Sequence, residues 1–306
     1  MNEPEKKFVP LDQARNPASN LPLVSAAELV ARQFREPKWA IPELVPEGVS
    51  ILAGAPKTGK SWLALDFAIA VAGGREAMGK VACEAGEVLL LALEDTERRL
   101  NSRLKAVLQG APAPADLSIA TKWNRADAGG LQDLKSWLIA HPKARLVIVD
   151  TLQTIRARPG RDEGVYASDY AAITGFKRLA DAFTVPVVLV HHIRKDAATD
   201  PLDSVSGTFG LTGSADTILV LKRKPNDHNA LLYVRGRDVN EAEVALQFDG
   251  DTGKWLRLGA GEDFRKTEER RAIIRAVIDG GPMTPREIAE AIGKKPGTVR
   301  VALLRM

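Results

Sequence analysis

The sequence is poor in cysteine and histidine, and each shortage excludes a class of protein. One cysteine among 306 residues allows neither an internal disulfide nor a cysteine-based zinc site. Four histidines without H-x-x-x-H spacing do not support a metal centre. No apolar run approaches the length needed to cross a bilayer, and the polar first twenty residues lack the apolar stretch of a signal peptide. We therefore expect a cytoplasmic protein with no membrane partner.

Positive charge is concentrated near the end of the chain. The formal net charge is +4. Residues 265–306 carry ten Lys and Arg against five Asp and Glu, so this segment is +5 and the other 264 residues total −1. Such a segment could bind an acidic polymer, or it could be the solvated surface of a few helices.

Short apolar runs alternate with segments of helical spacing through the middle of the chain. The runs at 87–93, 145–150 and 185–192 are typical of buried strands, and the segments between them are typical of amphipathic helices. This alternation predicts an α/β fold with a mainly parallel sheet and helices on both faces. After about residue 216, short strands separated by turn residues predict antiparallel strands at one sheet edge.

The same pattern predicts three parts along the chain. Residues 1–34 form an N-terminal arm with a short helix, for which Ser25 and Glu28 supply a capping box. Residues 35–260 form the α/β core. A charged linker at 259–269 then leads into a small helical unit over 265–306.

Residues Gly54 to Ser61 read G-x-x-x-x-G-K-S and follow an apolar run directly. In this P-loop pattern the glycines let backbone N–H groups point at phosphate oxygens, and the next helix adds its positive end. Lys60 should reach the β- and γ-phosphates, and Ser61 should bind Mg²⁺. We thus expect ATP and Mg²⁺. The expected nucleotide-binding residues are Gly54, Ala55, Pro56, Lys57, Thr58, Gly59, Lys60, Ser61 and Trp62.

Two predicted strands end in acidic residues. Asp150 ends "RLVIVD" and suits a Walker B acid that helps to hold Mg²⁺, although it could simply cap a turn. Glu94 ends "EVLLLALE" and could orient the attacking water. Asp95 competes for that role but could instead cap the following helix. We favour Glu94.

Two histidines end the strand that should lie beside the Asp150 strand. An imidazole at His191 or His192 could hydrogen-bond the γ-phosphate or a water and respond to its loss. Ordinary capping of the strand end is the alternative.

In this order the motifs resemble the RecA-like ATPases of the AAA class. The chain is most similar to the RepA family of plasmid replicative helicases and more distantly to the DnaB-type helicases. The resemblance covers about residues 35–258 and rests on "WAIPEL", "GAPKTGKSWLALDFA", "LALED", "VIVDTLQ", "VLVHHIRK" and "SGTFGLTGSADTILVLKR".

The resemblance implies a phage- or plasmid-related replication protein that forms a homohexameric ring. Such a ring hydrolyses ATP between subunits and moves along single-stranded DNA. Carried over by position, Lys60 and Ser61 bind phosphate and Mg²⁺, Glu94 is the catalytic base and Asp150 is the Walker B acid. His192 corresponds to the γ-phosphate sensor, where DnaB relatives carry glutamine.

The late segment "YVRGRDV" places Arg235 and Arg237 two residues apart at a strand end. The resemblance implies a basic pair that enters the nucleotide site of a neighbouring subunit, where a guanidinium can stabilise the transferring phosphoryl group. The alternative is a basic strand end that pairs with Asp238.

Two segments could face DNA in such a ring. The first, 156–164, contains Arg156, Arg158 and Arg161, whose charges would contact phosphates. The second, 194–210, is rich in Gly and Ser and has Phe209 as its only aromatic residue. Ser206 stands where RepA relatives carry arginine, so the DNA contacts of that family do not transfer directly.

The basic end of the chain reads as a helix-turn-helix. Its second helix begins at Thr284 and Pro285 with Glu287 completing a capping box, and Gly293 ends it. Such a unit, with no room for a wing before Met306, could contact double-stranded DNA or replication proteins. A small helical bundle for partner binding is the alternative. The expected apolar stripe is Ile273, Ile274, Val277 and Ile278, and the basic residues of the third helix are Lys294, Lys295 and Arg300.

These features favour an ATP-dependent DNA helicase or translocase. The alternative is an ATP-gated DNA-binding regulator or loader that does not unwind DNA. A small-molecule kinase would need an arginine-rich lid, which the sequence lacks, and Glu94 is better placed for water as the acceptor.

Overall fold

The computed structural model describes residues 23–156, 165–193 and 213–305. The chain divides into two units, Met1–Glu36 and Pro37–Met306, which are described separately. None of the helices in the described ranges is long and apolar enough to span a bilayer.

The first unit contains the short helix α1, Ala26–Ala31. Ser25 and Glu28 form the predicted capping box: the Ser25 N–H donates to the Glu28 carboxylate at 2.9 Å, and the Ser25 hydroxyl accepts from the Glu28 N–H at 3.2 Å. The helix buries none of its own residues, and Val30 is 87% exposed.

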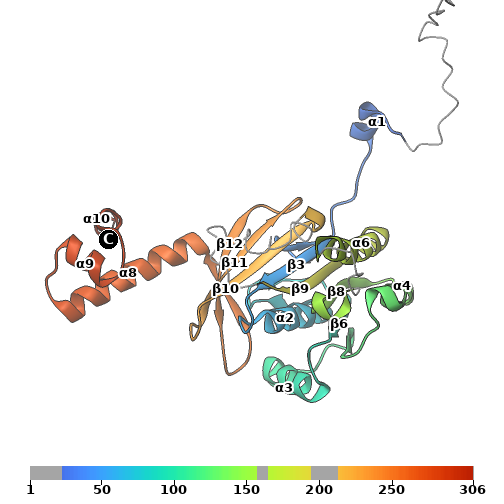
Figure 1. Cartoon of the computed structure of the whole chain (residues 1–306), viewed down its shortest axis with the longest axis horizontal. Helices are drawn as coiled ribbons and strands as arrows, with labels where there is room; N and C mark the ends of the chain where they lie inside the picture. Colours follow the sequence, from blue (N-terminus) through green and yellow to red (C-terminus); the bar gives the residue numbers. More distant parts are fainter. Residues whose placement is uncertain (1–22, 157–164, 194–212, 306) are drawn as a thin grey trace, which may run out of the picture. The chain divides into compact units, whose positions relative to one another are not determined.

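The second unit is built on a nine-stranded sheet (Figure 1). Its strand order is β13-β12-β11-β10-β3-β9-β8-β6-β7. These strands are β3 (Gly48–Gly54), β6 (Glu87–Ala92), β7 (Leu117–Ala120), β8 (Ala144–Asp150), β9 (Pro186–His192), β10 (Thr217–Arg223), β11 (Asn229–Gly236), β12 (Ala242–Phe248) and β13 (Trp255–Ala260). Two small hairpins are β1 (Trp39–Ile41) with β2 (Val45–Pro46), and β4 (Glu76–Ala77) with β5 (Val81–Ala82).

The sheet is parallel from β10 to β7 and antiparallel from β11 to β13, which confirms the predicted fold class. β10 is antiparallel to β11, as expected, but it is parallel to β3, which the sequence did not indicate. Thr217 pairs in parallel with Ser50, and Val220 with Ala53. The long connection after β9 brings the chain back to the edge where β3 begins, whereas the short turn at 224–228 allows only reversal.

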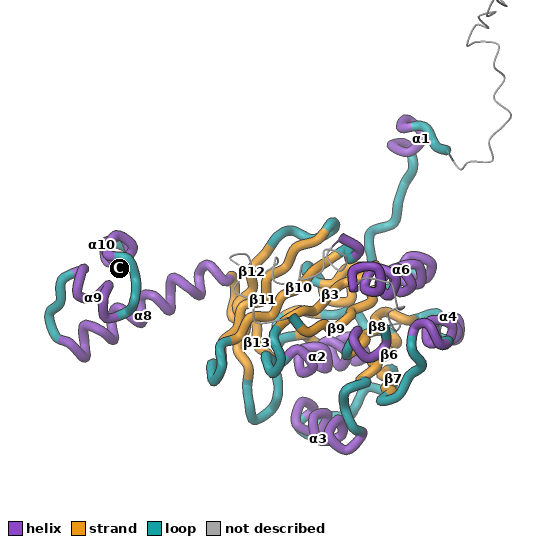
Figure 2. Tube along the Cα trace, viewed as in Figure 1, coloured by secondary structure: helices purple, strands orange, loops and turns teal. Residues whose placement is uncertain are grey.

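Helices cover both faces of the sheet (Figure 2). Alternate residues of β3 divide between the faces, because side chains of a strand point to opposite sides. Leu52 packs with α2 on one face, and Ile51 packs with α6 on the other. The first face carries α2 (Lys60–Gly73) and α3 (Glu97–Leu108), and the second carries α4 (Gly130–Ala140), α5 (Leu152–Ile155) and α6 (Val165–Phe183), with the 3-10 turn η2 (Ala126–Ala128) before α4.

Helix α2 leads directly from the phosphate-loop sequence into the core. It begins after Gly59 (φ 100°), and Gly74 (φ 57°) caps its C-terminal end. Gly73 and Gly74 are the glycine pair at which the sequence predicts the end of this helix. Nearly all of its residues are buried, as expected for a helix that is apolar all round. This burial fixes the start of α2, and therefore the loop before it, firmly in the fold.

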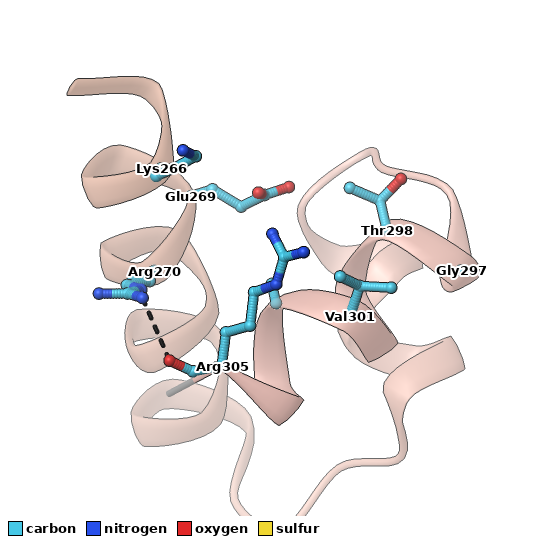
Figure 3. Close-up of a pocket in the computed structure, with 8 residues that line it drawn as sticks. Lys266, Glu269, Arg270, Gly297, Thr298, Val301 and Arg305 are labelled. Carbon is cyan, nitrogen blue, oxygen red and sulfur yellow. Dashed lines mark hydrogen bonds between the residues drawn. The ribbon is translucent and has the colours of Figure 1, made fainter. Parts of the chain in front are cut away.

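Three helices follow the sheet: α8 (Gly261–Gly280), α9 (Pro285–Ala291) and α10 (Pro296–Leu304). The capping box of Thr284 with Glu287 forms as predicted, and Pro285 takes the first helical position. In Figure 3, α8 faces α10, and the Arg270 guanidinium donates to the Arg305 carbonyl at 3.1 Å. The small core of these helices contains Ile273, Ile288, Ala289 and Val299.

Two expectations about this segment are wrong. The predicted linker at 259–269 is the end of β13 followed at once by α8. Glu262 in the first turn suits the positive end of the helix, and it pairs with Lys266 at 2.7 Å. The predicted apolar stripe is also too wide: Ile273 is buried, but Ile274 is 47% exposed and Ile278 is 75% exposed. The helix-turn-helix role therefore stays a prediction.

Candidate nucleotide-binding site

The candidate residues meet where the parallel strands end. Gly54, the last residue of β3, lies in register with His192 of β9. Asp150, the last residue of β8, pairs with Val190 of β9 and with Ala92 of β6. The carboxyl edge of a parallel sheet is where open α/β folds bind ligands. Three segments far apart in sequence are thereby brought to one site.

The loop between β3 and α2 needs both of its glycines. A Cβ on Gly54 would lie 2.7 Å from the Leu221 carbonyl oxygen. Gly59 has a φ of 100°, and a Cβ there would lie 2.7 Å from the Trp255 ring. The Trp255 indole also donates to the Gly59 carbonyl at 3.2 Å. The turn is thus packed so tightly that only glycine fits at these two positions. This packing holds the backbone of the loop in place at the site.

Lys60 is a buried cation at the start of α2. Lys60 is 3% exposed. Its ammonium group donates hydrogen bonds to the carbonyls of Gly54 at 2.7 Å and Ala55 at 2.9 Å. Burial lowers the pKa of Lys60 to about 8, while the charges of Asp150 and Glu94 partly offset that effect. A positive charge that is buried away from water is well suited to binding phosphate oxygens.

Ser61 and Asp150 form the second part of the site. The Ser61 hydroxyl hydrogen-bonds the Asp150 carboxylate, which lowers the pKa of Asp150, but burial outweighs this and raises it overall. Among the described residues, no group of three or more His, Cys, Asp or Glu side chains could hold a metal ion. One hydroxyl and one carboxylate fit Mg²⁺, which usually takes few protein ligands together with phosphates and waters.

Glu94 and Asp95 have different surroundings, although they are adjacent in sequence. The Thr151 hydroxyl donates to Glu94 Oε1 at 2.7 Å, and His192 Nε2 lies 3.4 Å from Glu94 Oε2. The Glu94 side chain is 49% exposed, and that of Asp95 is 7% exposed. Asp95 is held by Arg99 and Arg103 beside the start of α3. The geometry favours Glu94 over Asp95 for a water-facing role, which stays a prediction.

A cavity of about 350 Å³ opens beside the loop. Sequence reasoning missed part of its wall. The Arg103 guanidinium lies 5.1 Å from the Trp62 ring centroid, and that of Arg223 lies 4.8 Å from the ring of Phe248. No sequence motif links these residues, since they come from four elements. The lining consists of Lys57, Gly59, Lys60, Ser61, Trp62, Arg103, His192, Arg223 and Phe248.

Arg235 and Arg237 lie on the side of the sheet where the parallel strands begin, whereas the cavity lies where these strands end. Gly236 between them pairs with Thr217, and Thr217 pairs with Ser50 near the beginning of β3. The Arg235 guanidinium is 2.6 Å from Glu241, and its side chain is 46% exposed. Neither arginine is therefore brought to the chain's own candidate nucleotide site.

The predicted DNA-facing segments fall largely outside the described residues. Residues 157–164 and 194–212 are not described, and they include Arg158, Arg161, Ser206, Gly207 and Phe209. Arg156, which follows α5, is the one predicted DNA contact of the first segment that is described.

Comparisons with known proteins agree with this architecture. No curated protein matches the chain. A solved structure described as a DnaB-like replicative helicase and its interactions with primase aligns with a TM-score of 0.54 and 17% identity. The alignment covers 68% of this chain and 58% of that one, so the chain spans less than two thirds of its length. At this identity the likeness shows the fold alone, and that fold is RecA-like. The family described as an AAA domain matches residues 15–198, more than half of the chain. The chain belongs to this AAA-domain family.

Proposed function

We propose that the protein is an ATP-driven DNA helicase or translocase of the RepA type that works as a ring of identical subunits. One observation carries the proposal: the candidate nucleotide site and the Arg235–Arg237 pair lie at opposite edges of one sheet. In this proposal the arginines, which lie away from the phosphates of their own chain, act on those of the next copy. The AAA-domain family and the RecA-like fold support the same reading.

In this proposal the loop residues hold the triphosphate. Lys60 exchanges its hydrogen bonds with the Gly54 and Ala55 carbonyls for phosphate oxygens, which also offset the cost of burying its charge. Ser61 and Asp150 supply the protein oxygens for Mg²⁺. The metal ion would offset the charge that the phosphates carry and develop during transfer.

Glu94 holds the water that attacks the γ-phosphate. Its carboxylate is half exposed, and Thr151 fixes one oxygen, so the other remains available to accept a proton from water. His192 contacts that second oxygen at 3.4 Å and also lines the cavity. It can therefore sense whether the γ-phosphate is present and pass this on to the segment that follows β9.

The arginine pair completes the site from the adjacent subunit. Both side chains are about half exposed or more. Arg235 pairs with the exposed Glu241, and Arg237 makes a long contact of 3.4 Å with Asp216, so releasing either guanidinium costs little. A guanidinium placed on the transferring phosphoryl group can raise the rate by roughly a thousandfold or more. Hydrolysis would thus depend on correct contact between neighbouring subunits.

Steady-state phosphate release, with and without single-stranded DNA, tests the enzymatic part. The wild type should hydrolyse ATP without an added acceptor, and Lys60→Ala should abolish turnover. Glu94→Gln is the matched variant that should bind ATP normally and hydrolyse it at least about a hundredfold more slowly. Wild-type rates in Lys60→Ala would overturn the site assignment. Phosphate release that requires an added acceptor would instead indicate a kinase.

A mixing experiment tests action between subunits. Lys60→Ala keeps the arginine pair but lacks a working loop, and the double variant Arg235→Ala/Arg237→Ala has the reverse defect. Neither should hydrolyse ATP alone, but their mixture should regain a measurable part of the wild-type rate. Native mass spectrometry with a slowly hydrolysed ATP analogue should show a six-membered ring. A stable monomer and no recovery on mixing would contradict the proposal.

A second candidate function is an ATP-gated DNA-binding regulator or loader. The helices α8, α9 and α10 favour it, because a short helical unit with a net positive charge could contact duplex DNA. Strand displacement on a forked substrate separates the two functions. A helicase releases the displaced strand in an ATP-dependent manner, whereas a regulator binds DNA and hydrolyses ATP without displacement.

A further inference from the structure

The buried carboxylate of Asp216 links three elements where the parallel strands begin, at the opposite end of these strands from the nucleotide site. Asp216 immediately precedes β10, and its side chain is 9% exposed. It accepts from the Val49 N–H at 3.0 Å and from the Lys177 ammonium at 2.7 Å for each oxygen. The Arg237 guanidinium, 3.4 Å away, is a third donor. Lys177 comes from α6 and Arg237 follows β11.

The backbone is also fitted closely around Asp216. The Arg237 N–H donates to the Asp216 carbonyl at 2.9 Å. A Cβ on Gly48 would lie 2.6 Å from Asp216 Oδ2, and one on Gly236 would lie 2.6 Å from the Asp216 carbonyl oxygen. Glycines on both sides therefore let the strands approach, so the position of Asp216 is set by the fold rather than by its ion pairs.

The two cations hold Asp216 with very different strength. Lys177 makes two short contacts and its side chain is 30% exposed. Arg237 makes one contact of 3.4 Å to Asp216 and another of 3.4 Å to the Gly213 carbonyl, and its side chain is 61% exposed. Long contacts of an exposed side chain contribute little, so Arg237 is oriented by Asp216 without being fixed there.

We propose that Asp216, with its charge already neutralised by Lys177, is the positioning residue that presents Arg237 to the phosphates of a second copy of the chain. Because Lys177 stays in place, Arg237 can leave Asp216 without stranding a buried, unpaired carboxylate. Without Lys177, Asp216 would draw Arg237 inward and keep it from the neighbouring site. The inference rests on the proposed action of Arg237 between subunits.

The proposal predicts an unusual pattern in a pair of substitutions. Lys177→Met removes the charge but keeps the chain length, so Arg237 becomes held and kcat falls about tenfold. Asp216→Asn keeps an acceptor for the Val49 N–H but orients Arg237 less well, so kcat falls about threefold. The double variant has no carboxylate to hold Arg237, so it should resemble Asp216→Asn and be faster than Lys177→Met alone. Lys177→Arg should retain most of the wild-type kcat.

Measurements of kcat, ATP affinity and thermal unfolding on the full chain test this. ATP affinity should stay within about twofold in every variant, since the nucleotide site lies at the other edge of the sheet. A double variant as slow as Lys177→Met, or slower, would overturn the proposal, because the slow rate would then not depend on a carboxylate that holds Arg237. If Lys177→Met does not fold, Asp216→Asn alone decides: an unchanged kcat overturns the proposal, and a lower kcat with unchanged affinity supports it.

The mixing experiment with Lys60→Ala and the arginine double variant separates the positioning role of Asp216 from the action of the arginines between subunits. Recovery on mixing, together with additive losses at Lys177 and Asp216, would refute the positioning role and leave the proposed function intact. No recovery on mixing would refute action between subunits, and the positioning role would then fall with it.

Discussion

The Thr151 hydroxyl donates a hydrogen bond of 2.7 Å to the Glu94 carboxylate, across 57 residues of sequence. The contact joins the end of β8 to the segment after β6, and these two strands are neighbours in the sheet. Thr151 is 1% exposed, and its hydroxyl lies at the longer distance of 3.5 Å from the Thr154 hydroxyl. One Glu94 oxygen is therefore fixed, and the other is directed toward the cavity side, where His192 lies.

Removing this hydroxyl should slow hydrolysis without weakening ATP binding. Thr151→Val keeps the shape of the side chain but loses the hydrogen bond, and we expect kcat to fall about tenfold, the usual effect of one hydrogen bond to a charged group. Thr151→Ser keeps the hydroxyl and should stay within about threefold of wild type. Phosphate release and ATP titration check both values. A normal kcat in Thr151→Val would mean that Glu94 needs no such support.

ATP affinity should fall as the pH rises above the pKa of Lys60. Burial lowers this pKa to about 8, so the ammonium loses its proton in a range where free lysine would keep it. We expect the dissociation constant for ATP to rise by up to about tenfold per pH unit above pH 8. Lys60→Arg should bind more weakly at pH 7 but show little change up to pH 9.5, because arginine stays charged. Fluorescence or calorimetric titration between pH 7 and 9.5 checks this.

Folding stability should change in the opposite sense at the same residue. Between the folded pKa of about 8 and the ordinary value of 10.5, the unfolded chain binds the Lys60 proton and the folded chain does not. Its contribution to the free energy of unfolding therefore rises with pH across that window. A loss of ATP affinity above pH 8 thus cannot be attributed to unfolding through Lys60.

Local sequence patterns were enough to predict most of the longer strands and helices. The period of apolar residues placed β6, β8, β9 and α6 correctly, and the glycine pair at 73–74 marked the end of α2. These features depend on residues close together in sequence. The short edge strand β7 and the two small hairpins were missed, because strands of two to four residues leave no clear pattern.

Features that depend on distant contacts could not be predicted. The direction of β10 is set by its parallel pairing with β3. α8 follows β13 directly, and Arg265 of α8 pairs with Glu243 of β12. The wall of the cavity combines Arg103 and Phe248, which share no motif. The exposure of Ile278 likewise follows from the small size of the C-terminal core, which has room for one face of α8 only.

Trp62 should report nucleotide binding directly. It lines the cavity and stacks beneath the Arg103 guanidinium, so a bound nucleotide should change its fluorescence. Trp62→Phe should remove most of the signal and change the dissociation constant by no more than about fivefold, since a ring remains for stacking. Trp137, which stacks on His141 at a centroid distance of 4.2 Å, offers the control: Trp137→Phe should keep the signal. A signal that survives in Trp62→Phe would place the nucleotide elsewhere.

Asp66 should make the fold less stable at neutral pH than in mild acid. It lies within α2 and accepts from the Met78 N–H at 2.8 Å, but burial raises its pKa to about 7. Between the ordinary value of 3.8 and 7, the folded chain holds a proton that the unfolded chain has lost. The contribution of Asp66 to the free energy of unfolding therefore falls as the pH rises through this window, and it is lowest above pH 7.

Asp66→Asn should remove this dependence, because the amide oxygen still accepts from Met78 and carries no charge. We expect the variant to gain on the order of 2–4 kcal/mol relative to wild type on going from pH 4 to pH 8. Asp249→Asn is the control, and between pH 4 and pH 8 it should respond to pH as the wild type does. Hydrogen bonds from Thr252 and the Asp251 N–H lower the pKa of Asp249, so that carboxylate stabilises the fold above its unfolded pKa and its contribution is lost in acid. Urea denaturation at pH 4 and pH 8 compares the three proteins. If Asp66→Asn and wild type respond equally to pH, the Asp66 carboxyl group has the same pKa in the folded and unfolded chains.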